Sequence, residues 1–200
     1  MELNYKVSEQ DYLQVYMYAA TKNPIIKKQR KNGLIRMIVF SIIGLCLMYS
    51  TSLISLLVYF LFVVFIFCFY FFYYERKYYE TFYLKNIRTN LKNKIGLNSK
   101  VVFGLHDIIL TEPNTESKFN YSNIELIEEI KDYYYLKMIT GERFILPKNA
   151  IQNPKEFNEV ISRLTKDNHI PLQQELNWKW RVEVGYWLLD IGGWLLVVSC

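Results

Sequence analysis

MIVFSIIGLCLMYSTSLISLLVYFLFVVFIFCFYFFYY, residues 37–74, is a run of 38 positions without an Asp, Glu, Lys, Arg or His. As one helix it would be about 57 Å long, which is about twice the thickness of a bilayer's hydrocarbon core. We therefore expect the chain to fold back at the polar break Tyr49-Ser50-Thr51-Ser52. The sequence predicts a transmembrane helical hairpin over residues 34–74. Its first span is Leu34 to about Tyr49, and its second is about Leu53 to Tyr74.

The alternative to a transmembrane hairpin is a pair of buried helices in a soluble protein. A domain of this size is too small to cover two helices that carry Phe on every side. Tyr70, Tyr73 and Tyr74 close the second span, and tyrosine rings favour the membrane–water boundary. The first span is short unless Arg36 extends its long side chain to that boundary. The late start of the apolar run is unlike a signal peptide.

Basic residues flank the predicted hairpin on both sides. Residues 22–36 contain no acidic residue, and the loop between the spans carries no charge. Basic flanks stay on the cytoplasmic side, so we expect both hairpin ends in the cytoplasm. Candidate contacts for lipid headgroups are Lys27, Lys28, Arg30, Lys31, Arg36, Arg76 and Lys77. These side chains either sense anionic lipid or only set the topology.

The net charge of +5 is not a sign of nucleic-acid binding. Residues 96–171 hold eleven acidic and nine basic side chains, so the positive excess lies beside the predicted spans. Cys46, Cys68 and Cys200 show neither disulfide nor metal-site spacing, which suits a reducing cytoplasm.

Residues 1–23 predict a strand followed by a helix. Leu3, Tyr5 and Val7 alternate with polar residues, the period of a half-buried strand. Ser8 is a candidate N-cap for a helix from about Glu9 to Lys22. Both hairpin ends are expected in one compartment. We therefore predict that this strand pairs with the sheet of the C-terminal domain.

Residues 75–95 predict an amphipathic cytoplasmic helix, and Gly96 ends it. Its apolar stripe consists of Tyr79, Tyr83, Ile87, Leu91 and Ile95, spaced four residues apart. The helix either packs on its own domain, which we favour, or lies on the lipid surface.

Residues 97–170 predict a small antiparallel β domain closed by one helix. Its candidate strands are Lys100 to Leu105, Ile108 to Leu110, Lys118 to Tyr121, Ile124 to Ile130, Tyr133 to Ile139 and Arg143 to Leu146. Thr140-Gly141 joins the last two as a tight turn. The closing helix begins at Asn153-Pro154, and Phe157, Val160, Ile161 and Leu164 form its apolar stripe. The expected fold class is membrane α+β, with a curled sheet or barrel.

This order of elements resembles the bacterial YcxB-like family, whose C-terminal module is similar to a pleckstrin-homology-like (PH-like) fold. The resemblance rests on three stretches: Ser8-Glu9-Gln10-Asp11-Tyr12-Leu13, Asn123-Ile124-Glu125-Leu126-Ile127-Glu128-Glu129, and Phe144-Ile145-Leu146-Pro147-Lys148-Asn149-Ala150-Ile151. It spans about residues 2–166. The resemblance implies a multi-pass protein of the bacterial plasma (inner) membrane and supplies no catalytic residue.

No stretch of the sequence predicts an enzyme, a cofactor or a metal site. His106 and Asp107 are adjacent, so on a strand or turn their side chains point to different sides. The acidic residues Glu125, Glu128, Glu129 and Asp132 lack the glycine turn of a cation loop, and we expect a solvated strand edge that discourages pairing. Nucleotide-binding and metalloprotease motifs are absent.

Three functions remain open. The first is a non-catalytic binding module that presents Tyr133, Tyr134 and Tyr135 to a protein partner, unless these rings alternate between the core and a neighbouring strand. The second is a sensor of anionic lipid or envelope state that uses the basic flanks. The third is a homo-oligomer or a subunit of a larger membrane assembly, with Ser41 and Gly44 as small residues for helix contact.

Residues 171–200 form an apolar tail that holds all the tryptophans, Trp178, Trp180, Trp187 and Trp194. Asp190 and the pair Gly192-Gly193 oppose a third span, because a central Asp costs about 2.5–3.5 kcal/mol on insertion scales. We expect the tail to lie at the cytoplasmic interface or against the hairpin, or to have no defined role.

Overall fold

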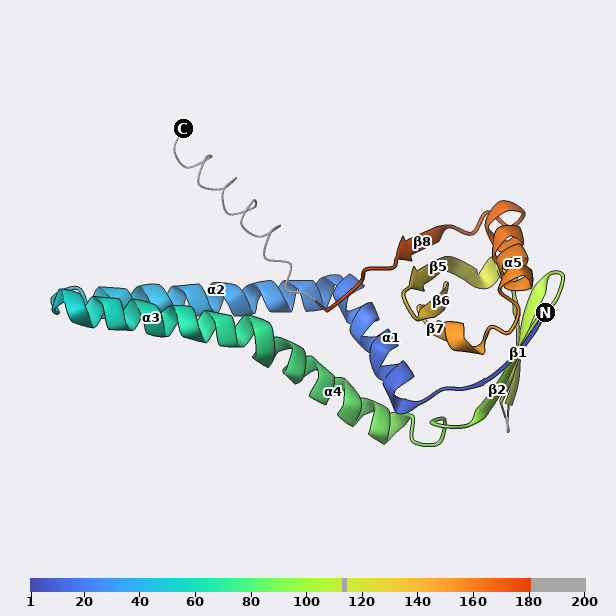
Figure 1. Cartoon of the computed structure of the whole chain (residues 1–200), viewed down its shortest axis with the longest axis horizontal. Coiled ribbons are helices and arrows are strands. Elements are labelled where there is room, and N and C mark those ends of the chain that lie inside the picture. Colours follow the sequence, from blue (N-terminus) through green and yellow to red (C-terminus); the bar gives the residue numbers. More distant parts are fainter. Residues whose placement is uncertain (113–114, 181–200) are drawn as a thin grey trace. The chain divides into compact units, whose positions relative to one another are not determined.

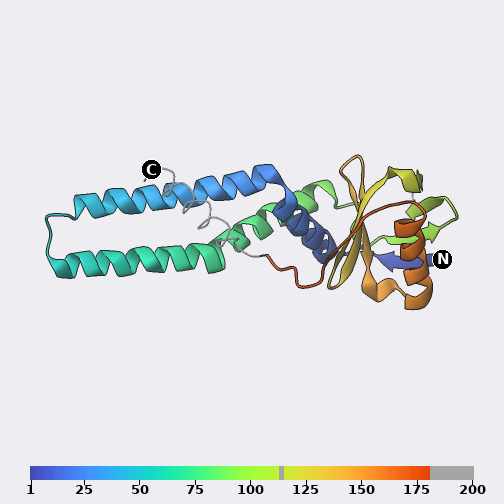
Figure 2. The same ribbon diagram turned by 90° about the horizontal axis from the view of Figure 1, so that it is seen from above.

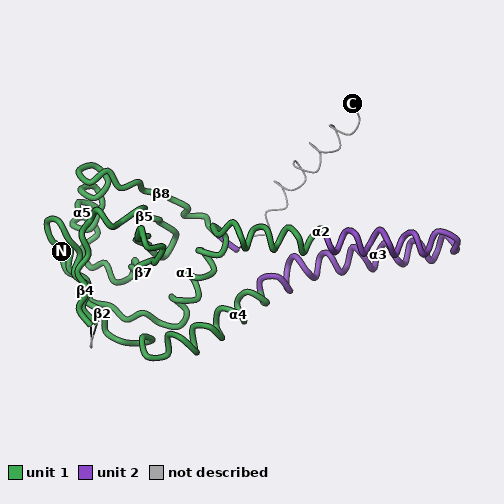
Figure 3. The backbone as a smooth tube through the Cα atoms, turned by 180° about the vertical axis from the view of Figure 1, so that it is seen from behind, with its two compact units in different colours: residues 1–35, 77–178 green, residues 36–76, 179–200 purple. Residues whose placement is uncertain are grey.

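The computed structural model describes residues 1–112 and 115–180 (Figure 1). The chain divides into two compact units. Unit 1 holds residues 1–35 and 77–178, and among the described residues unit 2 holds Arg36–Arg76, Lys179 and Trp180 (Figure 3). The prediction for the apolar part of the tail falls on residues 181–200, which lie outside the described residues.

The central part of the chain is helical. Helix α2 covers Pro24–Leu47, and α3 covers Leu53–Phe69. A π-helical turn at Tyr70–Tyr74 then leads without a break into α4, Glu75–Asn90. Among the described residues, one helix, Leu53–Asn90, is long and apolar enough to cross a bilayer, and none of its most apolar window is buried. The predicted helix over residues 75–95 thus ends five residues early, at Asn90.

Within unit 2, the part of α2 after Arg36 lies beside α3 (Figures 1 and 2). The chain turns between them at residues 48–52, and the Ser52 hydroxyl caps α3 by accepting from the backbone N–H of Ser55. The Tyr59 hydroxyl donates to the carbonyl oxygen of Ser41 at 2.9 Å. A side chain at Gly44 would overlap the Tyr59 ring, so glycine permits this close approach.

The first sheet of unit 1 combines one strand that precedes the helical region with three strands that follow it. Its strands are β1 (Glu2–Lys6), β2 (Asn98–Phe103), β3 (Asp107–Glu112) and β4 (Thr115–Asn120), in that order and all antiparallel. Leu3 lies opposite Val101. The prediction that the N-terminal strand pairs with the C-terminal domain is therefore confirmed, with Val7 just past the strand.

The second sheet is mixed. Its strands are β5 (Ile124–Ile130), β6 (Tyr133–Met138), β7 (Arg143–Pro147) and β8 (Leu172–Glu175), in the order β7-β6-β5-β8. Gly141, at φ 89°, makes the predicted turn between β6 and β7. Strand β8 pairs parallel to β5, which the sequence analysis did not expect. The two sheets do not join into a closed barrel within the described residues, so the fold is α+β without the barrel form.

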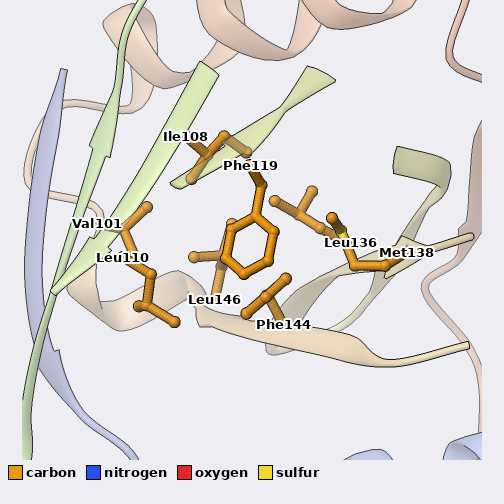
Figure 4. Close-up of a pocket in the computed structure, with 8 residues that line it drawn as sticks. All are labelled: Val101, Ile108, Leu110, Phe119, Leu136, Met138, Phe144 and Leu146. Atoms are coloured by element: carbon orange, nitrogen blue, oxygen red, sulfur yellow. The ribbon is translucent and has the colours of Figure 1, made fainter. Parts of the chain in front are cut away.

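Side chains from both sheets and from helix α5 (Pro154–Lys166) fill the core. Asn153 caps α5, and the predicted stripe of Phe157, Val160, Ile161 and Leu164 is buried. Apolar side chains from both sheets meet beside it and leave a void of only about 10 Å³ (Figure 4). The side chains in that view are Val101, Ile108, Leu110, Phe119, Leu136, Met138, Phe144 and Leu146. The void is apolar and at the lower size limit for one water molecule.

Helix α1 (Glu9–Lys22) packs on the second sheet through a separate apolar cluster. Ser8 and Asp11 form a capping box at its start, which confirms the predicted N-cap. Tyr18 lies against Tyr135 and Trp178, with ring centroids 5.4 and 5.3 Å apart. The domain therefore extends to Trp178, beyond the predicted boundary at residue 170.

Helix α4 packs on its own domain from Lys77 onward. Its Tyr83 ring stacks on Tyr16 of α1 at 5.7 Å, and its Arg88 Nε donates to Glu9 at 2.9 Å. Ile87 is fully buried. Of the two alternatives for this helix, packing on the domain is the one that agrees with these contacts.

Candidate functional site

The three tyrosines predicted as a partner surface are built into the domain. Tyr135 is 0% exposed and packs on Tyr18. The Tyr133 hydroxyl donates to Asp11 at 2.6 Å, and the Tyr134 ring lies 4.9 Å from the Phe157 ring. Burial raises the pKa of all three phenols, so they stay neutral. The expectation of an exposed tyrosine row is wrong, because these rings alternate between the core and neighbouring elements.

The prediction that the acidic residues form a solvated strand edge is wrong for Glu128 and Glu129. Glu128 is 2% exposed and Glu129 is 8% exposed. Arg143 Nε donates to Glu128 at 2.7 Å, and Lys148 Nζ donates to Glu129 at 2.7 Å. These carboxylates are buried because cations on β7 and just after it neutralise them. Burial alone would raise the pKa of Glu129, but hydrogen bonds from Lys148 and Gln174 lower it below the ordinary value.

The predicted headgroup contacts lie on two helices. Lys27, Lys28, Arg30, Lys31 and Arg36 belong to α2, and Arg76 and Lys77 lie at the start of α4. Their contact with lipid stays a prediction.

No hydrogen bond joins the side chains of His106 and Asp107 in the described part of the chain. Asp107 instead forms an ion pair with Lys118 at 2.8 Å, and the His106 carbonyl oxygen accepts from the backbone N–H of Tyr121. Within residues 1–112 and 115–180, no group of three or more His, Cys, Asp or Glu side chains could hold a metal ion.

A hollow of unit 1 lies between α1 and the two sheets, and we call it the α1 groove. Its volume is about 600 Å³. Rings and aliphatic side chains form most of its apolar lining, namely Tyr5, Val7, Tyr12, Val15, Tyr16, Ala19, Leu91, Leu110, Phe119, Phe144 and Ile145. Polar and charged residues and one glycine complete its wall, namely Lys94, Ser99, Glu112, Thr115, Ser117, Thr140, Gly141, Glu142 and Arg143.

The groove exists because two neighbouring strand edges do not pair. β4 ends the first sheet and β7 ends the second. The Phe119 ring on β4 lies 4.8 Å from the Phe144 ring on β7, so side chains alone bridge the sheets at this point. Helix α1 covers β7 and forms the facing wall. A narrower hollow of about 360 Å³ shares Tyr16, Ala19 and Arg143 with the groove and adds Lys22 and Lys137.

The polar groups of the groove suit binding. Burial, with the nearby Glu112 carboxylate as a smaller cause, raises the pKa of the Tyr12 hydroxyl to about 12. Burial likewise raises the pKa of Tyr5. Both hydroxyls are neutral at physiological pH, and neither donates to another described residue. Lys94 and Glu112 form an ion pair at 3.8 Å on the groove wall. The site thus offers neutral tyrosine donors, apolar surface and the charged groups of Lys94, Glu112, Glu142 and Arg143.

Sequence reasoning did not find this site. The lining comes from β1, α1, the segment after α4, β2, β3, β4, the turn between β6 and β7, and β7, and each element contributes only a few residues. The one local signal was the breadth of the apolar face of α1. Tyr12 and Tyr16 extend that face beyond the residues that reach the core.

Comparison with known proteins gives one match. A family model described as YcxB-like protein matches residues 103–162, which hold β3 to β7 and most of α5. The resemblance stated from the sequence is therefore confirmed for this part of the chain. No curated protein and no solved structure matches.

Proposed function

We propose that this chain is a membrane-tethered, non-catalytic binding module that holds a segment of a partner protein in the α1 groove, at the cytoplasmic face of a plasma membrane. The observation that carries this proposal is the groove, a hollow of about 600 Å³ with an aromatic lining and tyrosine hydroxyls free to donate. Tyrosine supplies a large contact area at small entropic cost. In this proposal the partner protein contacts the α1 groove and not the surface of Tyr133, Tyr134 and Tyr135 that the sequence analysis expected.

The pairing of β1 with β2 supports the proposed membrane topology. Paired strands lie in one compartment, so the chain between Lys6 and Asn98 crosses a bilayer an even number of times or not at all. The helix Leu53–Asn90 is long and apolar enough for one crossing. Many of its apolar side chains are exposed, and so large an exposed apolar surface is unfavourable in water. A second crossing is then required. α2 can supply it when Arg36 reaches the interface, which gives a transmembrane hairpin with both ends in the cytoplasm.

The order of elements in unit 1 supports a PH-like description of the folded domain. Two packed sheets closed by one C-terminal helix are the arrangement that the family resemblance implied. In this chain β1 precedes the helical region, and β8 adds a parallel strand to the second sheet.

Site-specific photo-cross-linking of the full chain in cells tests the binding proposal. A photoreactive side chain at Thr140, on the groove wall, should capture a protein, and one at exposed Lys155 on α5 should not. Ala19→Trp should fill the groove and lower the yield at Thr140 about tenfold, which corresponds to about 1.4 kcal/mol. Gln10→Trp, on the exposed side of α1, is the matched control. Equal capture from Lys155, or capture indifferent to Ala19→Trp, would contradict the proposal.

A second candidate function, recognition of anionic lipid, is favoured by the continuity of α2. This helix carries the predicted headgroup contacts and runs on into the uncharged segment. Each Lys or Arg near an anionic surface contributes about 1 kcal/mol. The full chain in vesicles with anionic lipid should then show salt-dependent protection of Lys27 and Lys28 from acylation, and in neutral vesicles it should not. Identical acylation in both vesicles would contradict lipid recognition.

A further inference from the structure

Strand β4 (Thr115–Asn120) is an open edge of the first sheet. β3 pairs with one side of it, and no described strand pairs with the other. Of the other outer edges, β1 lies beside the 3₁₀ turn Lys148–Ala150 and β7 lies beside α1, and β8 is only four residues long. β4 contains neither proline nor a bulge, and its protection against pairing with an unmatched strand is limited to the charged side chains of Glu116 and Lys118. The edge is therefore available to another strand.

The register of β4 decides which backbone groups face outward. Glu112 and Thr115 flank a two-residue connection, so they form a hydrogen-bonded pair of the hairpin. Pairs of this kind alternate along an antiparallel ladder, and Ser117 opposite Leu110 is the next one. The N–H and C=O groups of Glu116 and Lys118 consequently point away from β3, toward the open edge.

The charges along this edge are complementary to a second, antiparallel copy of the same strand. We propose that two copies of this chain pair through β4 about a two-fold axis at Ser117, which makes one continuous sheet across the dimer. This register places Glu116 of each copy opposite Lys118 of the other, with outward-pointing backbone groups on both. It adds two ion pairs and two hydrogen-bonded residue pairs. Both residues are exposed. Glu116 forms no ion pair with a described residue, whereas Lys118 pairs with Asp107 of its own copy at 2.8 Å, so its ammonium group would be shared between Asp107 and Glu116 of the second copy.

Neighbouring registers do not share this complementarity. An axis at Glu116 would place two carboxylates opposite each other, and an axis at Lys118 would place two ammonium groups opposite each other, both of which are unfavourable. The axis at Ser117 also keeps Thr115, Ser117 and Phe119 of both copies on one face, the face that lines the α1 groove. The grooves of the two copies would then adjoin along β4.

Disulfide trapping of the full chain tests this register. With Cys46, Cys68 and Cys200 replaced by serine, Ser117→Cys should give a cross-linked dimer under mild oxidation. The two side chains face each other in a non-hydrogen-bonded pair, where they are closest. Glu116→Cys is the matched control. In this register the two residues at position 116 lie on neighbouring strands but two residues apart along them, so their side chains are too far apart for a disulfide. Efficient cross-linking at residue 116, or equal yields at both positions, would overturn the proposal.

Charge reversal supplies an independent test in the Ser117→Cys background. Glu116→Lys should reduce the dimer yield several-fold, and Lys118→Glu should do the same. The double reversal should restore part of the yield, because it exchanges the charges between the two copies while the carboxylate introduced at position 118 still lies beside Asp107. Restoration also shows that the single variants had not simply unfolded. Single reversals without effect, or a double reversal that stays monomeric, would overturn the pairing, and a mixed disulfide with a different protein would assign the edge to that protein instead.

Discussion

Arg143→Met would leave the Glu128 carboxylate buried without its counter-charge. The Glu128 side chain is 2% exposed and that of Arg143 is 14% exposed, and the contact is two-pronged, at 2.7 and 3.4 Å. Removing one partner of a buried pair costs about 3–5 kcal/mol. For a folded unit of this size, that loss should lower the midpoint of thermal unfolding by about 10–15 °C.

The measurement is thermal unfolding of the full chain in mild detergent, followed by near-ultraviolet circular dichroism of the tyrosine-rich core. Lys137→Met is the matched control, because it breaks the more exposed pair Lys137–Glu125 on the same sheet and should cost less than about 1 kcal/mol. Combining Arg143→Met with Glu128→Leu should recover most of the stability, since no buried charge remains. Equal losses for Arg143→Met and Lys137→Met would refute the reasoning.

Three further changes test other parts of the folded unit. Leu3→Ala removes a side chain that is 2% exposed and should lower the free energy of unfolding by about 2–5 kcal/mol, whereas Asn4→Ala, at the exposed neighbouring position, should change it by less than about 0.5 kcal/mol in the same assay. Trp178→Ala removes an edge contact with Tyr18 and should cost more than about 1 kcal/mol; a loss no larger than that of Lys179→Ala would place the domain boundary earlier. The unfolded chain ionises Tyr12 near its ordinary pKa of 10.0, and the folded chain does so only near 12, so the stability contributed by Tyr12 should fall as pH rises from about 10 to about 12; a Tyr12→Phe variant whose stability depends on pH over this range as strongly as that of the unchanged chain would contradict this.

Features with a local signal could be predicted from the sequence. Ser8 and Asn153 are caps because a hydroxyl or amide oxygen satisfies backbone N–H groups within three residues, and both caps are present. The alternation of Leu3, Tyr5 and Val7 indicated a strand. The backbone N–H and C=O groups of a lone strand need hydrogen-bond partners, so the sheet of the C-terminal domain could be predicted as its partner without knowledge of the tertiary structure.

Features that depend on distant contacts could not be predicted. Leu172-Gln173-Gln174-Glu175 has no apolar alternation, and it becomes β8 only because the edge of β5 lies beside it. The sequence around Glu128 predicts a surface residue. It contains no signal that Arg143, fifteen residues later, forms an ion pair with this carboxylate and allows it to be buried. The α1 groove is assembled from segments spread over the chain from β1 to β7, so no single stretch of sequence predicts it.

The pairing of β1 with β2 also has a consequence for biosynthesis. The amino group of Met1 lies against the carbonyl oxygen of Phe103, 102 residues later in the chain. At about 5–20 residues per second, the ribosome completes β2 about 5–20 s after β1 has been made. For that time β1 has no partner strand, while the apolar helices are synthesised behind it. The nascent N-terminus must therefore be kept from pairing with other chains until β2 emerges, and translation speed through residues 24–97 should influence how much protein folds correctly.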